Sequence, residues 1–420
     1  MKISLCIIAK NEERVIGRCI DNIKNYVNEI IVIDTGSTDK TIEICKNKGA
    51  KVYNFTWTNN FSDARNYALK KASGEWIVFL DADEYIQESD MNVVLNKIEF
   101  ADKNGYEAIV CKCINLNEDN YTIKSVAFFI RIFKRSKNIR YVGSIHETIM
   151  NIKHSIKMID FTDDINVFHT GYTDSVINEK EKMSRNISLL YNELKKNPDD
   201  ADIHFYLVES LFIDKRYKEA YEHCNKVISL NNAKNTGVIT KVYSHKMKNM
   251  ILLEYDENEI KKVYDQAVKY DDTYPDYDWI MGMYYGSNGK NEKALGFYEK
   301  CYFKINNFNS KIESWTINIV KDIYIDLAKL YRVSNKNTEA VKVLMQVLNV
   351  YREDEEALGV LISILRESEE IENIVKFLRK IYNFESDKDI LIILKACKSI
   401  VDIDLFKYII NIKNNKKIYI

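Results

Sequence analysis

The stretch WIVFLDADE at residues 76–84 constrains the fold more than any other part of the chain. Five consecutive apolar residues rich in β-branched and aromatic side chains are typical of a strand covered on both faces, as in a parallel sheet flanked by helices. Three acids, Asp81, Asp83 and Glu84, follow directly and lie at the carboxyl end of that strand. Because ligands bind at this edge of open α/β sheets, the sequence predicts a site that uses clustered negative charge.

The first 115 residues or so alternate short apolar runs with helical stretches. ISLCIIA, EIIVID and KVYNF are typical of strands, and stretches such as EERVIGRCIDNIKNYV and DARNYALKKAS are typical of helices. This alternation predicts a parallel sheet with helices on its faces. We expect the sheet to continue through EAIVCKCINL and AFFIRIFKR.

Beyond about residue 176 the strand patterns end and helical patterns take over. Three segments share an aromatic-rich first helix, a polar turn, and a second helix that opens on Glu219-Ala220, Lys293-Ala294 or Glu339-Ala340. A small residue where two helices cross is what tandem helix-turn-helix arrays require. The segments resemble tetratricopeptide (TPR) repeats, and the alternative is an irregular helical bundle. We therefore predict an α/β domain over residues 1–175, a linker helix over 176–200 and an all-α TPR-like repeat domain over 201–420.

Composition excludes several classes of function. The 61 Lys and Arg residues nearly cancel the 62 Asp and Glu residues, and this balance argues against a nucleic-acid partner. The eight cysteines show neither paired metal spacing nor the density of a disulfide scaffold, which favours a reducing, cytoplasmic location. No stretch approaches the roughly 18 apolar residues of a membrane span, so we expect no integral membrane segment. The oligomeric state stays open, a homodimer included.

Four loops follow predicted strands, and in a doubly wound sheet such loops converge. An acid at a strand end can accept hydrogen bonds from a nucleobase or ribose, and a guanidinium offers a planar fork to a diphosphate. Two acids separated by one small residue can jointly hold a hard divalent cation. Each signal is weak alone, but their order and spacing together are specific. The candidate binding residues are Asn11, Glu12, Asp34, Asp63, Arg65, Asn66, Asp81 and Asp83.

Two downstream clusters add candidates for the same site. SIHETIM places His146 beside Glu147, and VFHTGYT places His169 before the helical half. A neutral imidazole is a good third ligand for a cation held by two carboxylates, so we predict His169 as a metal ligand; a structural histidine is the alternative. Glu147 is the candidate general base, Glu84 is the second choice, and a surface acid without a role is the alternative for either. His146 joins them in the candidate catalytic set.

Arg131, in the run FFIRIFKR, has two open interpretations. Its guanidinium either crosses the sheet toward the phosphates of a nucleotide or pairs with an acid of the fold. It is included among the candidate nucleotide-binding residues.

Residues 1–175 resemble family 2 glycosyltransferases of the GT-A fold, through SLCIIAKNEE, IVIDTGSTDKT, FSDARNYA and WIVFLDADE. The resemblance implies a Rossmann-like transferase domain that uses a UDP-sugar and a divalent cation, Mg²⁺ or Mn²⁺. It implies that Asp34 lies near the uracil or ribose, and that Arg65 and Asn66 face the nucleotide. Asp81 and Asp83 correspond to the D-x-D pair of the family, with Asp83 nearest the metal.

The resemblance has one departure and one extension. Many members carry a second acid directly after the first, and here that position is Thr35, so Asp63 is a candidate substitute for the base contact. A late histidine often completes the metal site of GT-A enzymes, which agrees with His169.

The expected activity is inverting transfer of a hexosyl group from a UDP-sugar. Family 2 domains fused to helical repeats resemble the peptide S-glycosyltransferases of glycocin biosynthesis and related bacterial protein glycosyltransferases. A helical-repeat groove suits a peptide or protein acceptor, with Cys, Ser or Thr receiving the sugar. The alternatives are a surface polysaccharide or lipid-linked glycan as acceptor, a nucleotidyltransferase, or a non-catalytic helical-repeat scaffold.

Overall fold

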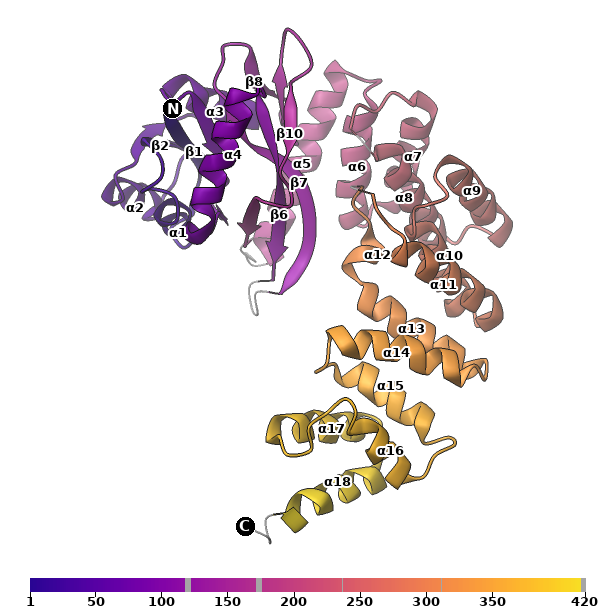
Figure 1. Cartoon of the computed structure of the whole chain (residues 1–420). Coiled ribbons are helices and arrows are strands. Elements are labelled where there is room, and N and C mark those ends of the chain that lie inside the picture. The colour runs from indigo at the N-terminus through magenta and orange to yellow at the C-terminus, as the bar shows by residue number, and fades with distance from the viewer. Residues whose placement is uncertain (118–121, 171–175, 236, 311, 417–420) are drawn as a thin grey trace. The chain divides into compact units, whose positions relative to one another are not determined.

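The computed structural model describes residues 1–117, 122–170, 176–235, 237–310 and 312–416 (Figure 1). Packing divides the chain into two compact units: Met1–Asn249 with Lys311–Glu313, and Met250–Ser310 with Ser314–Ile420. The first unit contains the α/β domain and the first helices of the helical region. The predicted boundaries at residues 175 and 200 stay predictions.

The α/β domain is built on a sheet whose described strands follow the order β3-β2-β1-β4-β7-β6-β11-β5, with β10 beside β6. A separate hairpin pairs β8 with β9. The strands are β1 Ile3–Ala9, β2 Glu29–Asp34, β3 Lys51–Asn54, β4 Trp76–Phe79, β5 Glu84–Tyr85, β6 Ala108–Leu116, β7 Ile123–Lys134, β8 Ile139–Val142, β9 Thr148–Asn151, β10 Met158–Asp160 and β11 Asn166–His169.

The sheet is mixed, which corrects the expectation of a parallel one. Strands β1 to β4 pair in parallel, as predicted, but β7 is antiparallel to both β4 and β6. The reason is the short connection between β6 and β7, because only antiparallel neighbours can be joined without a long crossover. Both segments expected to continue the sheet do so.

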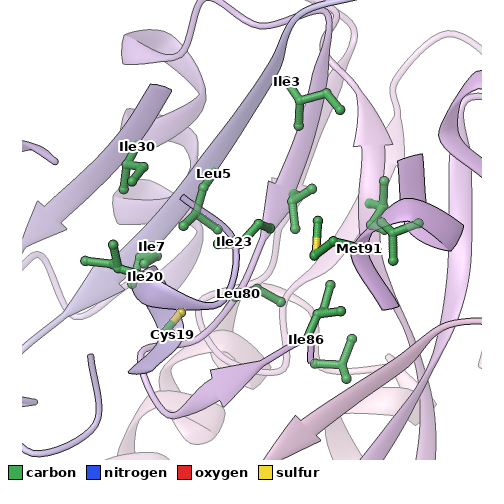
Figure 2. Packing of buried hydrophobic residues seen from close by; sticks show 14 of the residues in the cluster. Ile3, Leu5, Ile7, Cys19, Ile20, Ile23, Ile30, Leu80, Ile86 and Met91 are labelled. Carbon is green, nitrogen blue, oxygen red and sulfur yellow. The ribbon is translucent and has the colours of Figure 1, made fainter. Parts of the chain in front are cut away.

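Two cores on opposite faces of the sheet explain the continuous apolar runs. In β4 and the residue after it, Trp76, Val78 and Leu80 belong to one core cluster. Ile77 and Phe79 belong to the other. Because successive side chains point to opposite faces of a strand, burial on both faces removes the polar alternation of a half-exposed strand. Figure 2 shows part of the first cluster, to which β1 contributes Ile3, Leu5 and Ile7, α1 (Ile16–Asp21) contributes Cys19 and Ile20, and α4 (Met91–Lys103) contributes Met91.

Helices cover the two faces unequally. The first core contains residues of α1 (Ile16–Asp21), α2 (Thr41–Asn47) and α4 (Met91–Lys103), which follows the short 3₁₀ helix Glu88–Asp90. The second core contains residues of α3 (Phe61–Lys71) and of the β8–β9 hairpin. The hairpin therefore covers the part of this face that α3 leaves open. It also places the turn between β8 and β9 beside the start of α3.

From residue 176 onward the described elements are all helices, as predicted. They are α5 Val176–Lys196, α6 Ala201–Ile213, α7 Tyr217–Leu230, α8 Val238–Leu252, α9 Glu257–Tyr270, α10 Asp276–Ser287, α11 Asn291–Asn306, α12 Trp315–Asn318, α13 Val320–Val333, α14 Asn337–Val350, α15 Glu355–Leu365, α16 Ile371–Leu378, α17 Asp387–Ser399 and α18 Ile403–Lys416.

The alanines noted in the sequence lie in antiparallel helix pairs. Ala220, Ala294 and Ala340 are fully buried in α7, α11 and α14, which pack against α6, α10 and α13. Methyl side chains let the paired helices approach closely, as tandem helical repeats require. In the part of the chain that the structure describes, no helix is long and apolar enough to span a bilayer.

Candidate active site

The loops after β1 and β2 are braced against each other. Asn11, with a positive φ of 59°, accepts a hydrogen bond on Oδ1 from the Thr38 backbone N–H at 2.8 Å. Asn tolerates this left-handed conformation better than most residues do. The backbone N–H of Glu12 donates to Thr41 Oγ1 at 2.7 Å. Asn11 and Glu12 therefore shape this edge of the sheet, and their predicted contacts with a nucleotide stay predictions.

Asp34 ends β2 as a buried acid. Its Oδ2 accepts hydrogen bonds from the backbone N–H groups of Gly36 and Ser37 at 3.0 and 3.1 Å. This is the Asx turn that the DTGS sequence favours, and Gly36 supplies the positive φ of 110° that the turn needs. The carboxylate is thus fixed at the sheet edge, where its predicted contact with a base or ribose remains a prediction.

The helix after β3 contributes three candidates, and they have different surroundings. Asp63 is exposed and accepts a hydrogen bond from Thr58 Oγ1 at 3.0 Å. The Asn66 amide is used by the fold, because it donates to the Tyr141 carbonyl and accepts from the Tyr141 N–H, each at 2.9 Å. Arg65 is buried, and its guanidinium lies over the rings of Phe79 and Tyr141. Of the three, only Arg65 points at the acids that follow β4.

Asp81 lies between two arginines. Its Oδ1 accepts from Arg65 Nη2 at 2.8 Å, and its Oδ2 accepts from Arg131 Nη2 at 3.0 Å. Burial alone would raise the pKa of Asp81, but the two guanidinium charges lower it to about 2. Asp81 is therefore ionised at neutral pH, and both of its oxygens already have cationic partners.

Glu84 and Glu147 complete this network, and each pairs with one of the two arginines. Glu84 receives a bidentate pair from Arg131, with Nε to Oε2 at 2.8 Å and Nη2 to Oε1 at 2.6 Å. Glu147 accepts a hydrogen bond from Arg65 Nε. Burial would lower the pKa of Arg65, and the charges of Asp81 and Glu147 raise it instead. Of the two interpretations of Arg131, the structure shows the pairing with acids.

The side chains of this network differ in exposure. The side chains of Asp81, Asp83 and His169 are 32, 24 and 34% exposed. The side chain of Glu84 is only 3% exposed, and that of Glu147 is 10% exposed. The most exposed part of the network is therefore the Asp81, Asp83 and His169 edge, whereas Glu147 is partly exposed and Glu84 is almost completely buried.

Asp83 and His169, two of the predicted metal ligands, form a hydrogen-bonded pair. His169 Nε2 lies 3.0 Å from Asp83 Oδ2, and its Nδ1 lies 2.7 Å from Asn115 Oδ1. An amide oxygen can only accept a hydrogen bond, so His169 Nδ1 carries a proton. His169 Nε2 faces the Asp83 carboxylate, and a favourable contact between these two atoms requires a proton or a cation. Metal-binding histidines have this arrangement, with the distal nitrogen donating to an oxygen.

The carboxylates around His169 raise its pKa. Burial would lower the pKa, but the hydrogen bond to Asp83 and the charges of Asp83, Glu84 and Asp81 raise it above its usual value. Asp83 and His169 are the residues that would hold a divalent cation. Among the described residues, no group of three or more His, Cys, Asp and Glu side chains is arranged to enclose a metal by itself.

Sequence reasoning missed Asn115 and the aromatic pair around Arg65. Asn115 is 54 positions from His169 along the chain, and the parallel pairing of β6 with β11 brings them together. Asn115 lies on the same face of β6 as Cys111 and Cys113, and this two-residue spacing was the sequence feature that could have indicated its position. One amino group of Arg65, Nη1, is fully buried and has no hydrogen-bond partner among the described residues.

Comparison with known proteins identifies the domain that carries this site. Residues 4–168 match the family model described as Glycosyl transferase family 2. The α/β domain is a family 2 glycosyltransferase domain. This confirms the resemblance found in SLCIIAKNEE and WIVFLDADE, and it agrees with the mixed, GT-A-like sheet.

Two relatives and one solved structure extend the comparison. The chain is 31% identical over 230 residues to the SPbeta prophage-derived glycosyltransferase SunS of Bacillus subtilis, a match that covers 54% of this chain and 53% of SunS. It is 46% identical over 83 residues to a TPR repeat-containing protein of Synechococcus elongatus, covering 20% of this chain and 21% of that protein. The crystal structure of S. aureus TarS aligns with a TM-score of 0.36 and 16% identity, over 63% of this chain and 55% of TarS. The matched region is thus about half the length of SunS.

Proposed function

We propose that this protein is an inverting glycosyltransferase that moves a sugar from a UDP-sugar to a side chain of a peptide or protein. The observation that carries the proposal is the Asp81, Asp83 and His169 edge, within a domain of the family 2 type. SunS, with which the chain shares 31% identity, is also named as a glycosyltransferase.

The charge of the site supports a role for a divalent cation. Asp81, Asp83, Glu84 and Glu147 contribute four negative charges, and Arg65 and Arg131 contribute two positive charges, which leaves two negative charges when His169 is neutral. A nucleoside diphosphate is an anion, and this carboxylate-rich edge would repel it. A cation held by Asp83 and His169 would neutralise both sides and stabilise the charge that grows on the leaving UDP.

The protein's own side chains supply the remaining steps. Arg65 is held by Asp81 through Nη2 and by Glu147 through Nε, so its guanidinium is fixed in direction. Its positive charge is proposed to act with the cation on the charge that grows on the leaving UDP. Glu147 is the proposed base that takes the acceptor proton as the acceptor attacks the anomeric carbon. Glu84 is bound on both oxygens by Arg131, so we propose that it positions Arg131.

The repeats are the proposed docking surface for the acceptor. Helices of this region pair as α10 with α11 and α13 with α14. Helical arrays of this kind bind peptide segments along an extended surface, which supports the proposal. A glycan acceptor is the alternative, and the experiment below distinguishes the two.

Mass spectrometry of candidate peptides and host proteins, after incubation with a panel of UDP-sugars and Mn²⁺, tests the proposal. We expect the mass of one hexosyl group on Cys, Ser or Thr. Asp83→Ala should abolish transfer with the fold retained, and near-normal turnover of this variant at saturating Mn²⁺ would discard the metal assignment. Sugar found only on glycan acceptors would reject the peptide assignment, and the absence of any thermal shift with UDP and Mn²⁺ would favour the scaffold alternative.

A further inference from the structure

The turn between β8 and β9 is fixed to the start of α3. The Gly143 carbonyl accepts from Ser62 Oγ at 2.5 Å, and the Ser144 carbonyl accepts from the Phe61 N–H at 2.9 Å. Gly143 has a φ of 103°, a conformation that favours glycine, and His146 has a φ of 51°. A histidine in the left-handed region costs free energy of about 1 kcal/mol and persists only where its surroundings hold it.

Three consecutive side chains of this turn point to different partners. Ile145 packs against an apolar cluster of α5, α6 and α7 that includes Leu190, Leu207 and Leu211. The ring of His146 stacks on Tyr206 of α6, with centroids 4.0 Å apart and planes inclined by 9°. Glu147 reaches Arg65 in the site. The first helices of the helical region therefore hold two residues of the turn that carries the proposed base.

The stacking partner is itself fixed. Tyr206 is half-buried, and its hydroxyl accepts a hydrogen bond from Asn235 Nδ2 at 3.0 Å. The backbone N–H of Asn235 in turn donates to Asp202 Oδ1 at 3.1 Å. The hydroxyl end of the tyrosine side chain is thus held by Asn235, which follows α7.

We propose that Tyr206 is a positioning residue for the transfer reaction: it holds His146 and, through the turn, sets the direction of Glu147 toward Arg65. This inference rests on the proposed function, in which Glu147 is the base. It assigns His146 to the same positioning role, because its ring is engaged with Tyr206. A displacement of about 1 Å in a catalytic group can cost a hundredfold in rate, so a ring contact at this distance can control turnover.

Steady-state kinetics of UDP release from the UDP-sugar that the panel identifies, with full-length variants, tests the proposal. Tyr206→Leu keeps an apolar side chain but loses the flat ring, and we expect kcat to fall about tenfold while KM for the UDP-sugar stays within about twofold. Tyr206→Phe keeps the stack but loses the hydroxyl that accepts from Asn235, so its kcat should fall about threefold, less than that of Tyr206→Leu. Calorimetric binding of UDP with Mn²⁺ should be unchanged in both.

A double-mutant cycle separates positioning from independent effects. If His146 and Tyr206 act as one unit, the variant that combines His146→Ala with Tyr206→Leu should lose no more than about the tenfold loss of either single variant. A multiplied loss of about a hundredfold, or a Tyr206→Leu variant with more than half of the wild-type kcat, would overturn the proposal.

Asn235→Ala is the milder second variant should Tyr206→Leu fail to fold. It leaves the ring in place but removes the hydrogen bond that fixes it, and we expect kcat to fall about threefold. An unchanged kcat would overturn the proposal. A wild type that releases no UDP with any sugar refutes the proposed function, whereas an active wild type with fully active Tyr206→Leu and Asn235→Ala variants refutes only this inference.

Discussion

Substitution of Glu84 by Gln separates the two glutamates considered as bases, because the structure holds them differently. Both Glu84 oxygens are bound by Arg131, and Oε2 also accepts from the Asp81 backbone N–H at 3.0 Å. Glu84→Gln removes the charge and replaces one acceptor by a donor that faces the guanidinium. Arg131 would then keep Asp81 as its remaining carboxylate partner in the network.

The expected loss of stability follows from that geometry. Removing one partner of a buried ion pair costs about 3–5 kcal/mol, and the amide oxygen of Gln retains one hydrogen bond, so we expect a loss near the lower end, about 3 kcal/mol. In a unit as long as Met1–Asn249 each kcal/mol lowers Tm by about 2–4 °C. The expected fall in Tm is therefore about 6–12 °C.

Glu147→Gln is the matched control. The amide oxygen can still accept the hydrogen bond from Arg65 Nε, so the stability loss should be smaller, about 1–2 kcal/mol. An amide cannot take a proton, and kcat should fall about 10²–10⁴-fold with UDP binding retained.

Scanning calorimetry and UDP-release kinetics on both variants decide between the glutamates. A Glu84→Gln protein that melts within about 2 °C of the wild type would show that the ion pair is not a structural support. If the same variant lost turnover while Glu147→Gln stayed active, Glu84 would be the base and our assignment would be wrong.

Three further predictions concern Asn66, His245 and a truncated chain. Asn66→Ala should lower the free energy of unfolding by about 1–3 kcal/mol, because the Tyr141 backbone N–H and carbonyl both lose their partner. KM for the UDP-sugar should not change. A raised KM with unchanged urea unfolding would instead support contact between Asn66 and the nucleotide. Burial lowers the pKa of His245 to about 3, so the contribution of His245 to the free energy of unfolding should be constant above about pH 6.5 and fall by up to about 1.4 kcal/mol per pH unit below it. Urea unfolding at pH 7 and pH 5 measures this contribution. Between these two pH values the free energy of unfolding of His245→Leu should change less than that of the wild type, by the amount that corresponds to about one proton. An equal change in both proteins would contradict the lowered pKa of His245. Truncation after residue 200 removes α6 and exposes Ile145, so we expect a lower Tm and loss of UDP-sugar hydrolysis. A fragment with the Tm and the hydrolysis rate of the full chain would refute this expectation.

The sequence by itself determined the parts that depend on local pattern. Runs such as WIVFL predict strands buried on both faces, since side-chain direction alternates along a strand, and this is what the two cores on either side of β4 show. The step from Glu or Lys to Ala in the later helices predicts close helix pairs, and Ala220, Ala294 and Ala340 are buried there. The acids that follow β4 were likewise expected at the sheet edge.

Only the tertiary structure decided which charges pair. Arg131 is 50 positions from Asp81, and Glu147 is 82 positions from Arg65, and no local period relates such residues. Their contacts depend on the register of β7 beside β4 and on the hairpin that packs over the second face. The same holds for Tyr206, which reaches the turn at His146 because apolar side chains of α5 and α6 enclose Ile145. Strands and helices follow from short-range periodicity, whereas ion pairs and ring contacts between distant segments exist only once the chain has packed.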